Sequence, residues 1–265
     1  MIKVHRVIMI LSILIFMLVN LSACRSSHNN ITENNDDNMF IFQTISCDFD
    51  GDGKQETIEI KCALSNYETI IIESSGGSIN FKEILDLAPF QNIDPATAAI
   101  DLDGDGGEEL IIIANTGAAG GWGGKSLTIL TLDDETVKQI HIGGLFGYSA
   151  NGTLLDNFTA EIKVAETGNT FTYEFDDSVY FIQENFYDED GVLLKEGSVI
   201  LDAICYVNID TDSRIIEIGQ FLWSEMHANG NEFLITKVEF NKAGVNVVSQ
   251  YVEKYDNVVQ FLGQG

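Results

Sequence analysis

The sequence DLDGDGGEE at residues 101–109 repeats, with the same offsets, the stretch DFDGDGKQE at residues 48–56. Carboxylates fill positions 1, 3, 5 and 9 of both loops, and Gly fills positions 4 and 6, where a tight turn needs residues without Cβ. Alternate side chains therefore bend inward around one point, and the backbone carbonyl at position 7 can join them. The predicted metal ligands are the carboxylates of Asp48, Asp50, Asp52, Glu56, Asp101, Asp103, Asp105 and Glu109 and the carbonyls of Lys54 and Gly107.

This all-oxygen cage predicts a Ca²⁺ ion in each loop. Calcium takes about six to eight oxygen ligands, and four carboxylates packed this closely would repel one another strongly without a cation. Two solvated Asp-Gly turns are the alternative, but two copies with matching offsets favour calcium.

The main rival for the loops is an EF-hand. The first loop has Gly53 at position 6 and Glu59 at position 12, as that motif requires. The second loop has Ile112 at position 12, which cannot be a ligand, and EF-hand loops lie between helices. The flanking residues here favour strands.

Strand signals dominate the chain. Runs of β-branched and alternating apolar residues cover 39–47 and 57–64 around the first loop and 110–114 and 126–132 beyond the second. Later turn signals stand at residues 166–169, 188–191, 229–231 and 242–244. Residues 81–87 are the one segment that favours a short helix. The sequence therefore predicts an all-β domain over residues 39–265.

The acidic loops belong to a longer repeat. They start at Asp48 and Asp101, a weak copy starts at Thr153 and a degenerate copy starts at Asn208, so the offsets are 53, 52 and 55 residues. A fixed period of this size predicts repeated antiparallel β modules, about four in number. Asn208 replaces the first Asp of its copy and Ile216 stands at position 9, which leaves metal binding there open; none is expected at Thr153.

Residues 101–112 resemble the calcium loop of FG-GAP and VCBS-type repeats, and the Gly-rich stretch 115–122 is similar to one in VCBS-repeat lipoproteins. The resemblance implies a β-propeller-like fold in which Ca²⁺ ties a turn within each blade, and a place at the bacterial cell surface. Four modules are fewer than the family usually has, so closure of the propeller does not follow.

The N-terminus predicts export and lipidation. Lys3 and Arg6 precede an apolar run at 7–19 that is short for a bilayer span. The sequence LSAC at residues 21–24 resembles a lipobox, which implies a signal peptide over 1–23 and a diacylglyceryl, palmitate-type anchor on Cys24. A plain signal peptide or a signal anchor is the alternative. The polar residues after Cys24, up to residue 38, are expected to form a flexible tether.

Charge limits the partners. Loss of residues 1–23 leaves 12 basic against 41 acidic side chains, so the net charge becomes −29. Nucleic acid is therefore not an expected partner, since phosphate binding needs the opposite sign. The stretch AGGWGGKS at 119–126 matches a relaxed P-loop, but a β run at 127–132 follows it where a nucleotide site needs a helix, so no nucleotide is expected.

Single residues carry weaker signals. Cys47 and Cys62 flank the first loop, and an exported protein permits a disulfide between them; buried thiols are the alternative. Cys205 is then left over. Trp122 either packs on the core or offers an aromatic platform to a sugar or a peptide.

No catalytic motif stands out, and the histidines are isolated. The sequence therefore predicts an extracytoplasmic calcium-binding lipoprotein, attached to the cell membrane through its lipid, that serves as a binding or adhesion module for a polysaccharide or a protein. The alternative is a secreted hydrolase acting on a cell-wall or extracellular polymer, since a glycosidase pair is set by space rather than sequence.

Overall fold

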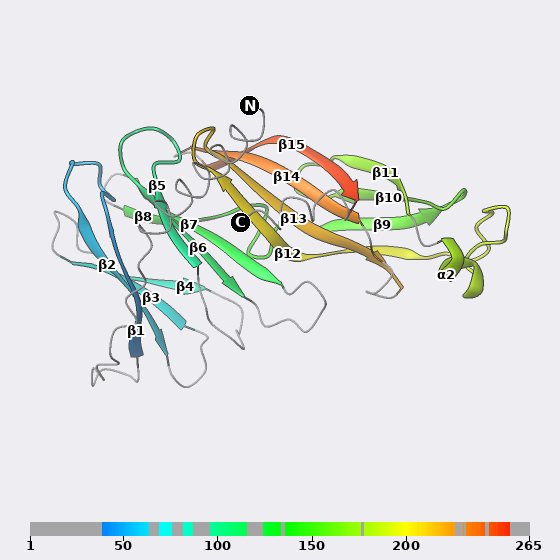
Figure 1. Ribbon diagram of the computed structural model, residues 1–265, viewed down its shortest axis with the longest axis horizontal. Coiled ribbons are helices and arrows are strands. Elements are labelled where there is room, and N and C mark those ends of the chain that lie inside the picture. Colours follow the sequence, from blue (N-terminus) through cyan, green and yellow to red (C-terminus); the bar gives the residue numbers. More distant parts are fainter. Residues whose placement is uncertain are drawn as a thin grey trace, which may run out of the picture.

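Strands flank both acidic loops, as the sequence predicted. Strands β1 (Met39–Cys47) and β2 (Glu56–Ala63) enclose the first loop, and β5 (Ala96–Ile100) and β6 (Glu109–Asn115) enclose the second (Figure 1). The computed structural model describes residues 39–63, 69–75, 82–86, 96–115, 124–133, 136–175, 178–225, 230, 232–241 and 244–254. Within these ranges the paired strands are antiparallel and the helix is the short α2 (Ser178–Gln183), so the chain is all-β.

Four antiparallel meanders follow one another along the chain. The first two are completed by β3 (Thr69–Ser75) and β4 (Lys82–Asp86), and by β7 (Lys125–Asp133) and β8 (Thr136–His141). The third contains β9 (Ala150–Leu155), β10 (Thr159–Val164) and β11 (Thr170–Glu174). The fourth contains β12 (Ser198–Asp210), β13 (Ile215–Ser224), β14 (Glu232–Asn241) and β15 (Gly244–Lys254).

The sequence repeat coincides with these meanders. The weak copy at Thr153 spans the turn between β9 and β10, and the degenerate copy at Asn208 spans the turn between β12 and β13. Each copy of the loop therefore lies in the first hairpin of its own meander.

The meanders are joined differently from propeller blades. Strand β1 to strand β4 form a separate sheet, whereas the other described strands form one sheet of 11 strands. Thr153 of β9 pairs with Ser198 of β12, and Lys125 of β7 pairs with Ile204 of β12. Blades of a propeller are separate sheets, so these shared pairs differ from the predicted arrangement of about four blades. The larger sheet curls into a half-barrel.

Strand β6 joins the two sheets because both of its faces are buried. Leu110 and Ile112 pack with Ile58 and Ile60 of the first sheet, whereas Ile111 belongs to the core of the curled sheet. Successive side chains of a strand point to opposite faces, which explains the unbroken apolar run. Each such side chain contributes about 1.5–3 kcal/mol when it leaves water.

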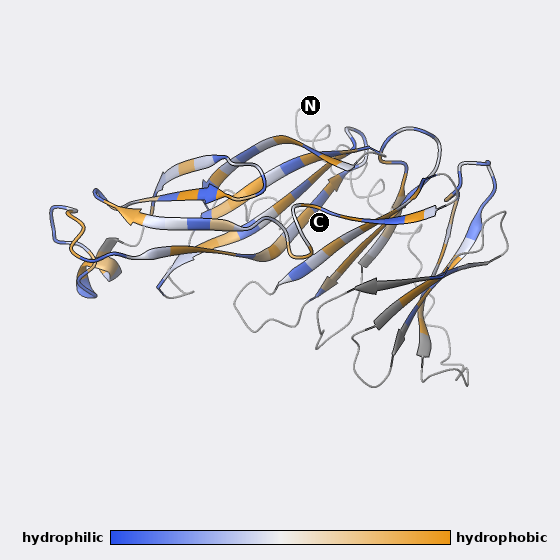
Figure 2. Ribbon diagram, turned by 180° about the vertical axis from the view of Figure 1, so that it is seen from behind, coloured by the Kyte–Doolittle hydropathy of each residue, from blue (hydrophilic) through white to orange (hydrophobic). Residues whose placement is uncertain are grey.

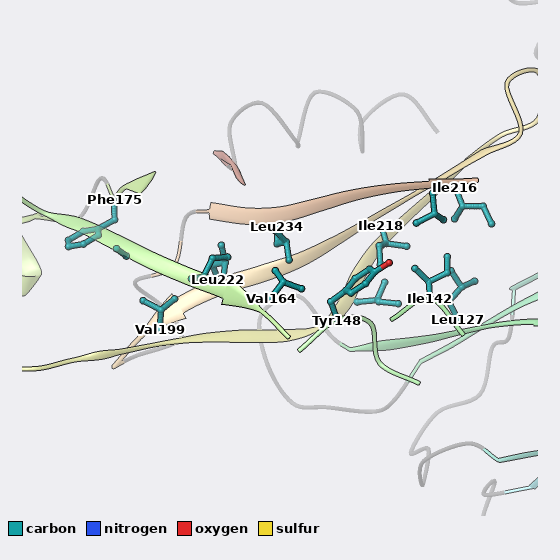
Figure 3. Packing of buried hydrophobic residues seen from close by; sticks show 14 of the residues in the cluster. Leu127, Ile142, Tyr148, Val164, Phe175, Val199, Ile216, Ile218, Leu222 and Leu234 are labelled. Atoms are coloured by element: carbon teal, nitrogen blue, oxygen red, sulfur yellow. The ribbon is translucent and has the colours of Figure 1, made fainter. Parts of the chain in front are cut away.

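The larger core lies inside the curl of the second sheet. Figure 3 shows Leu127, Ile142 and Ile216 near one end of this core and Phe175 and Val199 near the other. Figure 2 shows hydrophobic residues interspersed with hydrophilic ones along the strands. The alternation is regular in β10, whose buried and less buried positions follow the period of two that a one-sided strand requires.

Two sequence predictions are corrected here. The segment near residues 81–87, which favoured a helix, contains strand β4. The predicted disulfide is wrong, since Cys47 is a free cysteine. In the β1–β2 hairpin Cys47 is paired with Glu56, whereas Cys62 is paired with Phe40 toward the other end. Cysteines with Cα atoms more than about 7 Å apart cannot be bridged without backbone movement.

Several predictions concern residues outside the described ranges. These are the signal peptide, Cys24 with the tether, and Trp122. Within the described ranges no helix is long and apolar enough to cross a bilayer.

Candidate metal centre

Each acidic loop brings three carboxylates together. Oxygen atoms of Asp48, Asp50 and Glu56 lie within 4.8 Å of one another, and so do oxygen atoms of Asp101, Asp103 and Glu109. These are positions 1, 3 and 9 of the two loops. Each cluster could therefore hold a metal ion, with three of the four predicted carboxylates of its loop close together.

Backbone geometry explains how the loops turn their carboxylates inward. Gly51 and Gly53 have φ of 71° and 83°, and Gly104 and Gly106 have φ of 82° and 101°. These values lie in the left-handed region that residues with a Cβ rarely adopt. The early Asp side chains then accept bonds from the turn itself, for example from the Gly53 amide at 2.9 Å in the first loop.

The glutamates at position 9 close the cages from inside the protein. Glu56 and Glu109 are only 1% and 3% exposed and begin strands β2 and β6. One oxygen of Glu56 accepts the amide of Phe49 at 2.8 Å, and one oxygen of Glu109 accepts the amide of Leu102 at 2.8 Å. The strand thus holds the carboxylate beneath its own loop.

Oxygen atoms in the first loop lack the partners that burial demands. Oδ1 of Asp48 and Oε1 of Glu56 are buried and accept no hydrogen bond from any residue that the structure describes. Leaving a buried polar group unsatisfied costs about 1–3 kcal/mol, and more for a charged group. A cation between these oxygens would satisfy both. The donor set, which is all oxygen, suits Ca²⁺ rather than a metal that prefers nitrogen or sulfur.

The electrostatics of the second loop also favour a bound cation. The pKa of Glu109 is raised to about 7, mainly by burial and also by the nearby charges of Asp103 and Asp105, which together outweigh the lowering by the bonds from Leu102 and Thr131. Thr131 donates its hydroxyl to Oε1 of Glu109 at 3.1 Å. A divalent ion at this position would offset both the cost of burying the charged Glu109 carboxylate and its repulsion by Asp103 and Asp105.

The predicted ligands at position 5 stand outside these clusters. The Lys54 amino group donates to Asp52 at 2.6 Å, and this bond lowers the pKa of the Asp52 carboxyl. Asp105 accepts the Gly107 amide at 2.9 Å. The structure therefore brings together positions 1, 3 and 9, while Asp52, Asp105 and the carbonyls of Lys54 and Gly107 stay predicted ligands.

Cys47 lies next to the first cluster but is not suited to bind metal. The pKa of its thiol is raised to about 12, mainly by burial and also by the negative charges of Glu108, Glu56 and Asp48. Since the thiolate is the form that binds metals, this buried thiol acts as an apolar core residue.

The degenerate copy at Asn208 brings an arginine side chain to the second acidic loop. Asp210 accepts the Ser213 hydroxyl at 2.6 Å within its own turn. The next residue, Arg214, places its Nη2 atom 3.7 Å from Oδ2 of Asp101, and its guanidinium lies over Gly104, where a Cβ would come within 1.9 Å of Nη1. In the weak copy, Asp156 accepts the Leu193 amide at 2.8 Å.

Sequence reasoning missed that the loops touch. The turns at residues 48–55, 101–108 and 211–214 lie near one another along the upper edge of Figure 1. Asp48 exchanges two hydrogen bonds with Glu108, and Arg214 reaches Asp101. A common repeat position was the one signal available, but it does not say which modules are in contact.

The chain matches no protein-family model, no curated protein and no solved structure.

Proposed function

We propose that this protein is an extracytoplasmic lipoprotein whose β domain carries two structural Ca²⁺ ions and serves as a binding or adhesion module. The pair of three-carboxylate clusters, with buried unsatisfied oxygens in the first, carries the proposal. One ion would bind in the loop of the β1–β2 hairpin and the other in the loop of the β5–β6 hairpin. Each ion would fix the turn and the register of the two strands beside it.

A structural role fits the surroundings of the clusters better than a catalytic one. Metal-assisted hydrolysis needs an activated water and, as a rule, a positioned base. The side chain that contacts Glu109 is a threonine hydroxyl, and the amino group in the first loop is already paired with Asp52. In both loops the Asp ligands lie in the tight turn of a hairpin and the Glu ligand begins its second strand, so a bound ion would hold the turn and the strand together.

Two observations support the binding role. The first is the resemblance of residues 101–112 to VCBS and FG-GAP repeats, in a loop that lies in the first hairpin of its meander. An open surface pocket of about 660 Å³ lies between β8, the turn after β10 and the start of β15. Gln139, His141 and Thr167 line it beside Val245 and Val247. Such a mixed lining suits a small polar ligand or a segment of a polysaccharide or a peptide.

Calcium should stabilise the chain against heat. Extracellular calcium modules have Kd values of about 10⁻⁴–10⁻³ M, and each site adds roughly 1.4 kcal/mol when Ca²⁺ is at ten times its Kd. Calorimetry on the full chain, first stripped with chelator, is expected to find two ions and a raised Tm. Mg²⁺ at equal concentration serves as the control and should raise Tm less. A stoichiometry of zero, or a Tm unmoved by Ca²⁺, would refute the metal part of the proposal.

Lipid on Cys24 should keep the protein at the membrane. The lipobox at residues 21–24 supports this attachment, and an anchor with two acyl chains is stable where a single chain is marginal. We expect Cys24→Ala to release the protein or to leave its signal unprocessed, as membrane fractionation and the mass of the product would show. Normal processing together with unchanged fractionation of the variant would exclude the anchor.

A further inference from the structure

The two acidic loops interlock through Glu108. The amide of Glu108 donates to the carbonyl of Asp48 at 2.8 Å, and the amide of Asp48 donates to Oε2 of Glu108 at 2.7 Å. Asp48 is the first carboxylate of the first cluster, while Glu108 directly precedes Glu109 of the second cluster. One residue of the second loop therefore fixes both backbone polar groups of a predicted ligand in the first.

Glycines let the two backbones come this close. A Cβ on Gly51 would lie 3.1 Å from the amide nitrogen of Gly107, and a Cβ on Gly107 would lie 3.4 Å from the carbonyl oxygen of Phe49. A contact of 3.1 Å is tighter than nine in ten real Cβ contacts, so the neighbouring backbone would have to move. The loops are thus packed backbone to backbone, so that a shift of one is transmitted to the other.

We propose that Glu108 is a positioning residue of the first calcium site and that it couples the two sites, so that an ion in either loop raises the affinity of the other. This inference rests on the proposed function. An ion held by Glu109 restrains the neighbouring Glu108, and Glu108 then holds Asp48 in place. The first loop consequently loses less conformational entropy when its own ion binds. Coupling of this kind acts equally in both directions.

Charge does not cancel this effect. Two divalent ions in neighbouring loops repel each other, but each would lie among three carboxylates whose negative charge offsets its own. The carboxylate of Glu108 lies against the amide of Asp48 and adds negative charge at the contact. The contact therefore supplies charge compensation as well as rigidity.

The first loop offers a matched control. Gln55 occupies position 8 there, as Glu108 does in the second loop. Its Oε1 accepts the hydroxyl of Ser46 at 3.2 Å within the same hairpin. Truncation of Gln55 removes a side chain of equal size from the equivalent position without touching the bonds between the loops.

The test measures Ca²⁺ binding to the full chain by titration calorimetry, with one site disabled at a time. Asp103→Asn disables the second site, and we expect the affinity of the first to fall about fivefold or more. Asp50→Asn should lower the affinity of the second by the same factor. Glu108→Ala should weaken the first site to a similar extent, with no further loss when it is combined with Asp103→Asn.

Two further variants separate positioning from general stability. Glu108→Gln retains an oxygen that can accept the Asp48 amide. In this variant the factor by which an ion in one loop raises the affinity of the other should stay within about twofold of the wild type. Gln55→Ala should leave that factor unchanged. If Glu108→Ala does not fold, Glu108→Ser replaces it. Two ions whose affinities are independent within twofold would overturn the inference and leave the proposed function standing. Intact coupling in Glu108→Ala would overturn the role of Glu108. A chain that binds no Ca²⁺ would overturn the proposed function as well.

Discussion

Without metal at pH 8, the Glu109→Gln variant is expected to be more stable than the wild-type chain, and with Ca²⁺ the order should reverse. The pKa of Glu109 rises from 4.5 to about 7 because the side chain is buried and faces Asp103 and Asp105. In the folded, metal-free chain its charged form is therefore disfavoured relative to the unfolded chain. Stability from this group is intact below pH 4.5 and falls as the pH rises toward 7.

The expected size of this effect is about 3 kcal/mol at pH 8, because the pKa rises from 4.5 to about 7 and each tenfold change in the protonation equilibrium is worth about 1.36 kcal/mol. Glutamine keeps an oxygen for the Leu102 amide and carries no charge. Chemical denaturation in chelator should show the gap at pH 8 and show most of it gone at pH 5. Saturating Ca²⁺ should favour the wild type, whose carboxylate binds the ion. A wild type that remains the more stable form at pH 8 in chelator would contradict the electrostatic explanation of this site.

Asp50→Ala and Asp103→Ala should each remove one ion and leave the other loop able to bind. Each removes a charged ligand from a three-carboxylate cluster, and calcium affinity depends on the number of such charges, so a loss on the order of 100-fold at that site is expected. The Tm in Ca²⁺ should fall for both variants. The Tm in chelator should stay equal or rise, because one repelling charge is gone.

The comparison variant for this pair is Asp52→Ala. Its carboxylate is paired with Lys54 and stands outside the cluster, so its loss should weaken calcium less. Melting curves with and without Ca²⁺ measure the Tm of all three variants. A variant that keeps its Tm in Ca²⁺ but loses an activity outright would show that calcium takes part in a reaction. The hydrolase alternative would then be favoured over the binding module.

Local features of the site could be predicted because spacing encodes them. Four glycines and alternating carboxylates specify the turns, and the structure gives those glycines positive φ. The β-branched runs beside the loops form strands, and each repeat of the motif corresponds to one meander. These properties depend on residues close in sequence, so a single chain reveals them.

Properties set by register and packing could not be predicted. Cys47 directly precedes the first loop, but Cys62 lies six positions beyond Glu56, and pairing in a hairpin joins residues equally far from the turn. The sharing of one sheet by β9 and β12 depends on contacts between modules. The bonds between Asp48 and Glu108 and the approach of Arg214 to Asp101 depend on the same docking. The spacing of residues within a motif does not indicate any of these contacts.

The most direct measurement is an anomalous difference map from crystals of the full chain grown with Ca²⁺ or soaked with a lanthanide. We predict one peak in each loop, about 2.3–2.6 Å from the carboxylate oxygens when Ca²⁺ is bound. The first peak should contact Asp48, Asp50 and Glu56, and the second should contact Asp101, Asp103 and Glu109. Well-ordered loops without a peak at a saturating concentration of Ca²⁺, or an ion bound elsewhere in the domain, would contradict the assignment of these loops as calcium sites.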